Sequence, residues 1–188
     1  MLYLKLRRII LLGGLVAGLG ILYSCGNSAS SPENSSAEKV VKQNPDGSIS
    51  LSLDNADFYS DVINRICNTA EWSVVVSKSG RYDVWLSSAT RDTTNLNYKN
   101  TVMVSLRDLD LEIEGLPTCD KIIHNSKDVK YPFFKADSYL GTVYIRDTGK
   151  MNIQVNSEQI LPKDYLSDNK SGDDPGKLLS VSFKPSLR

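Results

Sequence analysis

The chain has 188 residues and carries 22 basic and 22 acidic side chains, which gives a formal net charge of +0 at pH 7. Because the charge is balanced and no basic block occurs, the sequence lacks the electrostatic footprint of a nucleic-acid binder, and we exclude nucleic acid as a partner. Beyond two N-terminal segments, residues 48–188 remain, and this length fits a single folded domain.

The chain begins with a basic stretch that is followed by an apolar one. Lys5, Arg7 and Arg8 precede residues 9–23, which carry no charge. This order is typical of a secretory signal, and the apolar run is shorter than the roughly 20 residues that a membrane-spanning helix needs. We therefore predict that residues 1–24 are a signal peptide.

The apolar run ends at Leu22-Tyr23-Ser24-Cys25-Gly26, which resembles the lipobox of bacterial lipoproteins. In a lipobox the cysteine thiolate accepts the lipid, and the small residue before it gives the peptidase access to the bond. The resemblance implies cleavage before Cys25, lipidation of Cys25 and a membrane as partner, by default the bacterial outer membrane. An ordinary signal peptide with a chance cysteine, or an uncleaved anchor, is the alternative.

Residues 25–47 follow the predicted cleavage site. Residues 27–36 consist largely of Ser, Asn, Ala and Pro. Such a composition cannot bury enough apolar area to fold. We therefore predict that residues 25–47 are a flexible tether between the lipidated cysteine and the domain.

After the tether, apolar and polar residues alternate in eight runs that are separated by turn residues. Strict alternation is typical of strands with one buried face. Eight such runs with short turns between them predict an all-β fold, an antiparallel β-sandwich over residues 48–188. The runs are 49–53, 72–76, 82–86, 102–106, 109–113, 140–145, 151–155 and 179–183.

Three segments interrupt this pattern. Residues 54–68 have loose helical spacing at Val62, Ile63 and Ile66, which indicates one short helix or an irregular loop. Residues 90–100 and 162–176 are long and polar. Long loops on a rigid sandwich are where binding usually occurs.

Residues 70–86 and 140–153 carry a resemblance to a known family. The first stretch opens a strand at Trp72, turns at Gly80 and returns through Tyr82-Asp83-Val84; the second begins at Leu140-Gly141, turns at Gly149 and returns as an alternating strand. Residues 48–188, including a closing run at 178–185, are similar to carbohydrate-binding modules of families 6 and 35, sandwiches appended to bacterial fucosidases and sulfatases. The resemblance implies a galactose-binding-like jelly roll.

Residues suited to catalysis do not form a recognisable set. His124 is the single histidine and lies in a polar stretch, without a nucleophile elbow of the G-x-S-x-G kind. Glu112 and Glu114 share one face of a strand, which we interpret as a solvated face rather than a pair of glycosidase carboxylates. We therefore predict that the chain is not an enzyme and requires no cofactor.

Acidic residues and cysteines offer two further kinds of site. Asp168, Asn169, Asp173 and Asp174 lie close together in the late loop, but they lack the alternation of a calcium-binding loop, so we favour a plain acidic loop and predict no metal. Cys67 and Cys119 form a disulfide in one interpretation, since exported cysteines can oxidise. In the other interpretation they are buried free thiols.

Aromatic residues carry the hypothesis of sugar binding, because the apolar face of a sugar packs on an exposed ring and amides bond its hydroxyls. Trp85 lies on the opposite strand face from its apolar neighbours, Tyr98 lies in a polar loop, and Tyr165 lies near Asn169. These four residues are the candidate ligand-binding set.

The expected function is glycan binding by a non-catalytic envelope lipoprotein. The alternative is a structural or protein-interaction lipoprotein of the envelope. We assign four other aromatic residues to the core: Trp72, Tyr82, Phe133 and Phe134.

Overall fold

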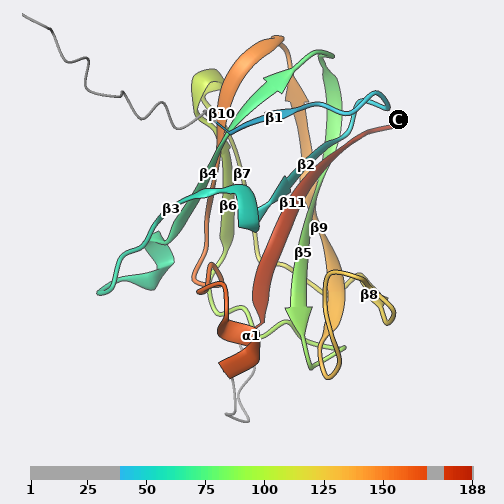
Figure 1. The fold of residues 1–188 in the computed structure, drawn as a ribbon. Helices are drawn as coiled ribbons and strands as arrows, with labels where there is room; N and C mark the ends of the chain where they lie inside the picture. Colours follow the sequence, from blue (N-terminus) through green and yellow to red (C-terminus); the bar gives the residue numbers. More distant parts are fainter. Residues whose placement is uncertain (1–38, 169–175, 188) are drawn as a thin grey trace, which may run out of the picture. The chain divides into compact units, whose positions relative to one another are not determined.

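The computed structural model describes residues 39–168 and 176–187 (Figure 1). They belong to one compact unit, Ala37–Arg188. The predicted signal peptide and the predicted lipidation site at Cys25 lie outside the described residues, so both stay predictions.

Two β-sheets pack face to face and form the sandwich that the sequence predicts (Figure 1). Every described strand pair is antiparallel except the pair of β1 and β4, which is parallel. One sheet has, in spatial order, β1 (Val40–Lys42), β4 (Thr69–Val76), β10 (Gly149–Asn156), β6 (Val102–Leu106) and β7 (Leu111–Gly115), with β3 (Asp57–Tyr59) on the remaining part of β4. The other has β2 (Ile49–Ser52), β11 (Lys177–Pro185), β5 (Gly80–Thr90), β9 (Phe134–Ile145) and β8 (Lys121–Ile123).

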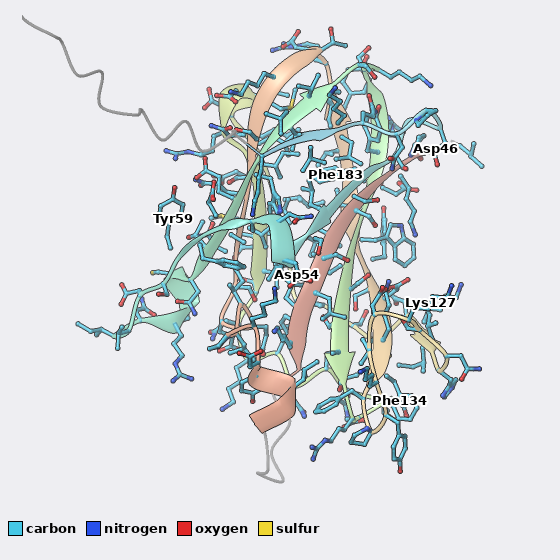
Figure 2. All side chains as sticks on the ribbon, viewed as in Figure 1. Asp46, Asp54, Tyr59, Lys127, Phe134 and Phe183 are labelled. Atoms are coloured by element: carbon cyan, nitrogen blue, oxygen red, sulfur yellow. The ribbon has the colours of Figure 1, made fainter. Side chains whose placement is uncertain are left out.

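The core lies between the two sheets and is formed by the apolar positions of the alternating runs. In β4, the side chains of Ala70, Trp72, Val74 and Val76 are buried, while the residues between them are partly exposed. Phe183 of β11 points into the same core from the other sheet (Figure 2). All buried members of this core lie within residues 49–183. The unit therefore contains its own hydrophobic core, which is what independent folding of a domain requires.

The first strand lies inside the segment that the sequence assigns to the tether. Val41 packs against the core from β1, and the Gln43 side chain donates to the hydroxyl of Tyr82 at 2.7 Å. Oε1 of Gln43 accepts a hydrogen bond from the backbone N–H of Ser77 at 2.8 Å. These contacts join residues 40–47 to the sandwich, so the predicted tether boundary at residue 47 is too late.

Helical structure is sparse in the described residues. The segment 54–68, for which the sequence leaves a helix or a loop open, contains β3 between two 3-10 turns. No helix in the described ranges is long and apolar enough to cross a membrane. The helical elements are the 3-10 turns η1 (Leu53–Asn55), η2 (Arg65–Cys67) and η3 (Arg107–Leu109) and the helix α1 (Tyr165–Asp168).

Candidate functional site

The outer face of the five-stranded sheet carries a polar hollow with aromatic side chains. Its volume is about 740 Å³, within the range of roughly 300–1,000 Å³ that is usual for ligand sites. The hollow lies over β5 and β9, which are adjacent strands (Figure 1). The residues that line it include Arg81, Asp83, Trp85, Asp120, Tyr139 and Thr142.

Strand β5 supplies one row of these side chains through simple alternation. Tyr82, Val84 and Leu86 point into the core and are at most 2% exposed. Successive side chains of a strand point to opposite faces, so Arg81, Asp83 and Trp85 face solvent. The outward position that the sequence predicts for Trp85 is confirmed.

Strand β9 supplies the second row with the help of a β-bulge. Gly141 is opposite Val84 and Tyr139 is opposite Trp85, so Leu140 is an additional residue without a partner in the pairing. On the inner face, the next buried residue after Ser138 is Val143. Regular alternation would separate two residues of one face by an even number of positions, and this separation is odd. The bulge therefore places the side chains of Tyr139 and Thr142, which lie on either side of it, on the same outer face, and re-aiming side chains is a recognised use of bulges beside binding sites.

Glycine is required at the bulge for two reasons. Gly141 has φ of +152°, a backbone conformation that L side chains rarely adopt. A Cβ at Gly141 would also overlap Cδ1 of Ile113, which packs beneath it from β7. Close approach of a neighbouring side chain and an unusual φ are the two conditions that select glycine.

The bulge brings two aromatic rings together on the outer face. The ring centroids of Trp85 and Tyr139 are 5.4 Å apart, with the planes inclined by 55°. The Tyr139 side chain is 43% exposed, and Trp85 is partly exposed. The Nζ of Lys184 lies 5.1 Å from the Trp85 ring centroid, a cation–π distance.

Hydrogen bonds fix the orientation of the Tyr139 ring. The hydroxyl of Thr142 donates its single proton to Oδ1 of Asp83 at 2.8 Å. The bond of 2.6 Å between the hydroxyls of Tyr139 and Thr142 must therefore have Tyr139 as its donor. The backbone N–H of Tyr139 also donates to Oδ2 of Asp120 at 2.7 Å. Tyr139 is thus held from both its ring and its backbone.

Charged groups of both signs surround the rings. Asp83 and Asp120 each accept hydrogen bonds from neighbouring residues, as described above, whereas the guanidinium of Arg81 has no hydrogen-bond or ion-pair partner among residues 39–168 and 176–187. Arg81 therefore offers planar donors to a ligand. In the described part of the chain, no group of three His, Cys, Asp or Glu side chains is placed to hold a metal ion.

Tyr98 does not belong to this face, which corrects the prediction of an exposed ring. Its side chain is 9% exposed, and its hydroxyl bonds the hydroxyl of Ser88 at 2.7 Å. Burial raises the pKa of the Tyr98 phenol far above its usual value, against the smaller effect of the Ser88 bond. Leu96 is also buried, so Leu96 and Tyr98 together anchor the polar loop 90–100 in the core.

Tyr165 lies at a different place from Trp85. It is partly buried in α1 and lines an apolar hollow beside β11. Asn169 lies outside the described residues, as do Asp173 and Asp174, and Asp168 is the last residue of α1. Of the predicted ligand set, the structure therefore places only Trp85 at the polar hollow.

Cys67 and Cys119 are both free, so of the two interpretations the structure supports the free thiols, although Cys67 is exposed and not buried. Cys67 is exposed at the end of η2, where its Sγ accepts from Nδ2 of Asn64 at 3.3 Å. The thiol of Cys119 donates instead to the carbonyl of Thr93 at 3.4 Å. Burial, followed by the charges of Asp120 and Asp92, raises the pKa of the Cys119 thiol.

Other residues singled out by the sequence have structural positions. The expected solvated face of Glu112 and Glu114 is confirmed, since both are exposed on β7. His124 is exposed and contacts the edge of Phe134, with ring centroids 5.2 Å apart. Among the four aromatic residues assigned to the core, only Phe134 is partly exposed; Trp72, Tyr82 and Phe133 are buried.

Sequence reasoning missed Tyr139, Asp83, Thr142 and Arg81. The first of these was detectable in part, because the apolar run at 140–145 has an interval of three between Leu140 and Val143 around a glycine. A glycine inside a strand pattern often marks a bulge. No local signal shows that β5 and β9 are neighbours, and this pairing is what places the four residues together.

Comparisons with known proteins bear on the fold. No family model matches the sequence, and no curated protein matches it. Among solved structures, the α-L-fucosidase from Vibrio sp. strain EJY3 is similar with a TM-score of 0.56 and 20% identity, over 79% of this chain and 24% of the fucosidase. The GH26-CBM35 β-(1,4)-mannanase of Podospora anserina has a TM-score of 0.44 and 12% identity, over 76% of this chain and 28% of the mannanase.

The chain spans about a quarter of the fucosidase, so the likeness concerns one part of that enzyme. At this identity the likeness shows the fold and not the activity. In fold, the chain is an all-β sandwich of two sheets, similar to a part of that α-L-fucosidase.

Proposed function

We propose that the chain is a non-catalytic, carbohydrate-binding-like domain that binds a glycan on the outer face of its five-stranded sheet. The observation that carries the proposal is the pair of Trp85 and Tyr139 at the polar hollow. Part of the face of a sugar ring is apolar, and it packs against aromatic rings that are held in place. The hydroxyls around that ring need donors and acceptors, which Arg81, Asp83 and Asp120 supply.

The polar network favours a pre-organised site. Because Tyr139 is held through Thr142 and Asp120, little side-chain freedom is left to lose when a ligand binds. One stacked ring with a few hydrogen bonds gives weak binding, with Kd of order 10 µM to 1 mM, or about 4–7 kcal/mol.

The proposed setting is the bacterial cell envelope. It rests on the lipobox-like residues that end at Cys25, because lipid on that cysteine would anchor the domain to a membrane. A glycan-binding domain on such an anchor would hold polysaccharide close to the cell.

A glycan array probed with the unit Ala37–Arg188 tests this function. We expect retention on a group of related glycans, and loss of that retention for Trp85→Ala. Retention of no glycan, together with capture of envelope proteins, would favour the structural or protein-interaction alternative.

A further inference from the structure

A second hollow lies at the end of the sandwich that carries α1 and has apolar walls. Its volume is about 650 Å³. One wall is the segment after β2, which includes Asp54 and Tyr59, both labelled in Figure 2. The other wall is residues 160–165, which lead into α1 (Figure 1). Its apolar lining residues include Leu53, Phe58, Val62, Ile160, Leu161 and Leu179.

A buried asparagine ties the two walls together. The side chain of Asn68 is 7% exposed. Its Oδ1 accepts from the backbone N–H of Asp61 in the first wall at 3.0 Å, and its Nδ2 donates to the carbonyl of Ile160 in the second wall at 3.2 Å. One buried amide thus links the two walls of the hollow.

A buried cation lies in the same hollow. Lys177, at the start of β11, is 8% exposed, and it is the only charged side chain that is buried in the described part of the chain. Its ammonium donates to the carbonyls of Pro162 and Lys163, each at 2.8 Å. An ammonium has three protons, so one remains without an acceptor among the described residues.

The buried position of Lys177 has an energetic cost. Burial lowers the pKa of Lys177, while the carboxylates of Asp54 and Asp164 act in the opposite direction. A buried charge is retained where it has partners, and an unused proton of a buried ammonium is a strong donor for a ligand.

The charges that line the hollow favour an anionic ligand group. Three cations, Arg65, Lys163 and Lys177, and two carboxylates, Asp54 and Asp61, are present. Oδ1 of Asp61 already accepts from the backbone N–H groups of Ile63 at 2.8 Å and Asn64 at 2.9 Å. The lining thus has one more cation than carboxylate, and an anionic ligand group would find a buried donor at Lys177.

We propose that this hollow binds a small amphiphile that has an apolar chain and a carboxylate head. The chain lies between Phe58 and Leu179, and a carboxylate oxygen accepts the remaining proton of Lys177. Ligand sites of this kind combine apolar walls with few fixed polar groups. The site is separate from the polar hollow at Trp85 and does not depend on the proposed function.

Calorimetry on the unit Ala37–Arg188 tests this proposal, with three probes of equal chain length at concentrations below micelle formation. The probes are laurate, dodecanol and dodecyltrimethylammonium. We expect laurate to bind at least about tenfold more tightly than the cationic probe, because their chains match and only the heads differ. Equal affinity for the two charged probes, or no binding of laurate, would overturn the proposal.

Matched variants locate the site. Phe58 lines the hollow and is 51% exposed; Ile66 does not line it and is 47% exposed. Phe58→Ser should weaken laurate binding about tenfold, and Ile66→Ser should leave it unchanged. Equal affinities for the two variants would place laurate elsewhere and overturn the proposal.

A third variant tests the contact with the head group. Lys177→Met should weaken laurate binding about tenfold and change dodecanol binding less than twofold. If Lys177→Met does not fold, the comparison of laurate with dodecyltrimethylammonium on the unchanged chain still decides whether a buried cation selects the head.

Discussion

Trp85 and Tyr139 are directly opposite each other on neighbouring antiparallel strands, and their ring centroids are 5.4 Å apart. Leu140, the additional residue of the bulge in β9, allows both side chains to lie on the outer face. Cross-strand aromatic pairs stabilise a sheet by roughly 0.2–1 kcal/mol, so this pair contributes modestly to the fold. Its position on the solvent face, beside the guanidinium of Arg81, supports the proposed ligand site.

The bulge at Gly141 gives the first prediction. Gly141→Ala adds a Cβ that overlaps Ile113 and requires an unfavourable φ, so we expect a loss of roughly 1–3 kcal/mol in the free energy of unfolding. Urea unfolding measures this loss. Gly149 is the control, because it also has positive φ, +126°, but no atom within 4 Å of an added Cβ. If the two variants lose equal free energy of unfolding, the overlap with Ile113 makes no contribution to the loss at Gly141.

Much of the fold is predictable because most strands have one buried face. In β10 the apolar positions alternate with polar ones, and the structure buries the apolar set. In β11 Val181 and Phe183 are buried as predicted, whereas Leu179 is partly exposed because the strand is irregular between Leu178 and Ser180. The strands that the sequence does not indicate lack this property. All three residues of β3 are exposed, and β1 and β8 have only three residues each, too few for a period to be visible.

The site is less predictable because it depends on contacts between distant residues. Alternation within its own strand assigns Trp85 to the outer face, and the structure confirms this position. Tyr139 and Thr142 share that face only because of the bulge, which depends on how β9 pairs with β5. Tyr98 looks exposed in its polar loop, yet its hydroxyl finds Ser88 in the core. A buried partner ten residues away gives no local signal in the sequence.

Tyr98→Phe should destabilise the fold by about 1 kcal/mol, because it removes the bond to the buried Ser88 hydroxyl. The variant should also change the pH dependence. The pKa of Tyr98 is raised in the folded state, so its contribution to stability is full below the unfolded pKa of about 10 and is lost as the pH rises above it. Unfolding by urea at pH 7 and pH 10.5 should show a smaller alkaline loss for Tyr98→Phe than for the unchanged chain.

Thiol labelling tests the free state of the cysteines. With no reductant present, both Cys67 and Cys119 of the folded unit should react with iodoacetamide. We expect faster reaction at the exposed Cys67, because the thiol of Cys119 has a raised pKa and is partly buried. Mass spectrometry of tryptic peptides over time gives both rates. Labelling that appears only after reduction would instead establish a disulfide.

The lipidation prediction is tested by Cys25→Ala in the full chain. Without the thiol, no lipid can be attached, so the protein should be found unprocessed or in the soluble fraction. Fractionation of expressing bacteria with an immunoblot measures this distribution. Recovery of Cys25→Ala in the membrane pellet at the level of the unchanged chain would mean that Cys25 is not the anchor.

The central claim is that the pair of Trp85 and Tyr139 forms a glycan site, and its most direct test is calorimetric titration of the tightest glycan from the array. The unchanged unit, Trp85→Ala, Tyr139→Ala and Tyr59→Ala would be compared, with Tm recorded for each. Tyr59 is a suitable control because it is 59% exposed and lies on β3, in the other sheet.

We predict that Trp85→Ala and Tyr139→Ala abolish measurable binding, that Tyr59→Ala leaves Kd unchanged, and that each Tm changes by only a few degrees, about 1 kcal/mol or less. Unchanged glycan affinity in folded Trp85→Ala would contradict the claim. Unfolding of Trp85→Ala would also contradict it, because it would show that Trp85 serves the fold rather than a ligand.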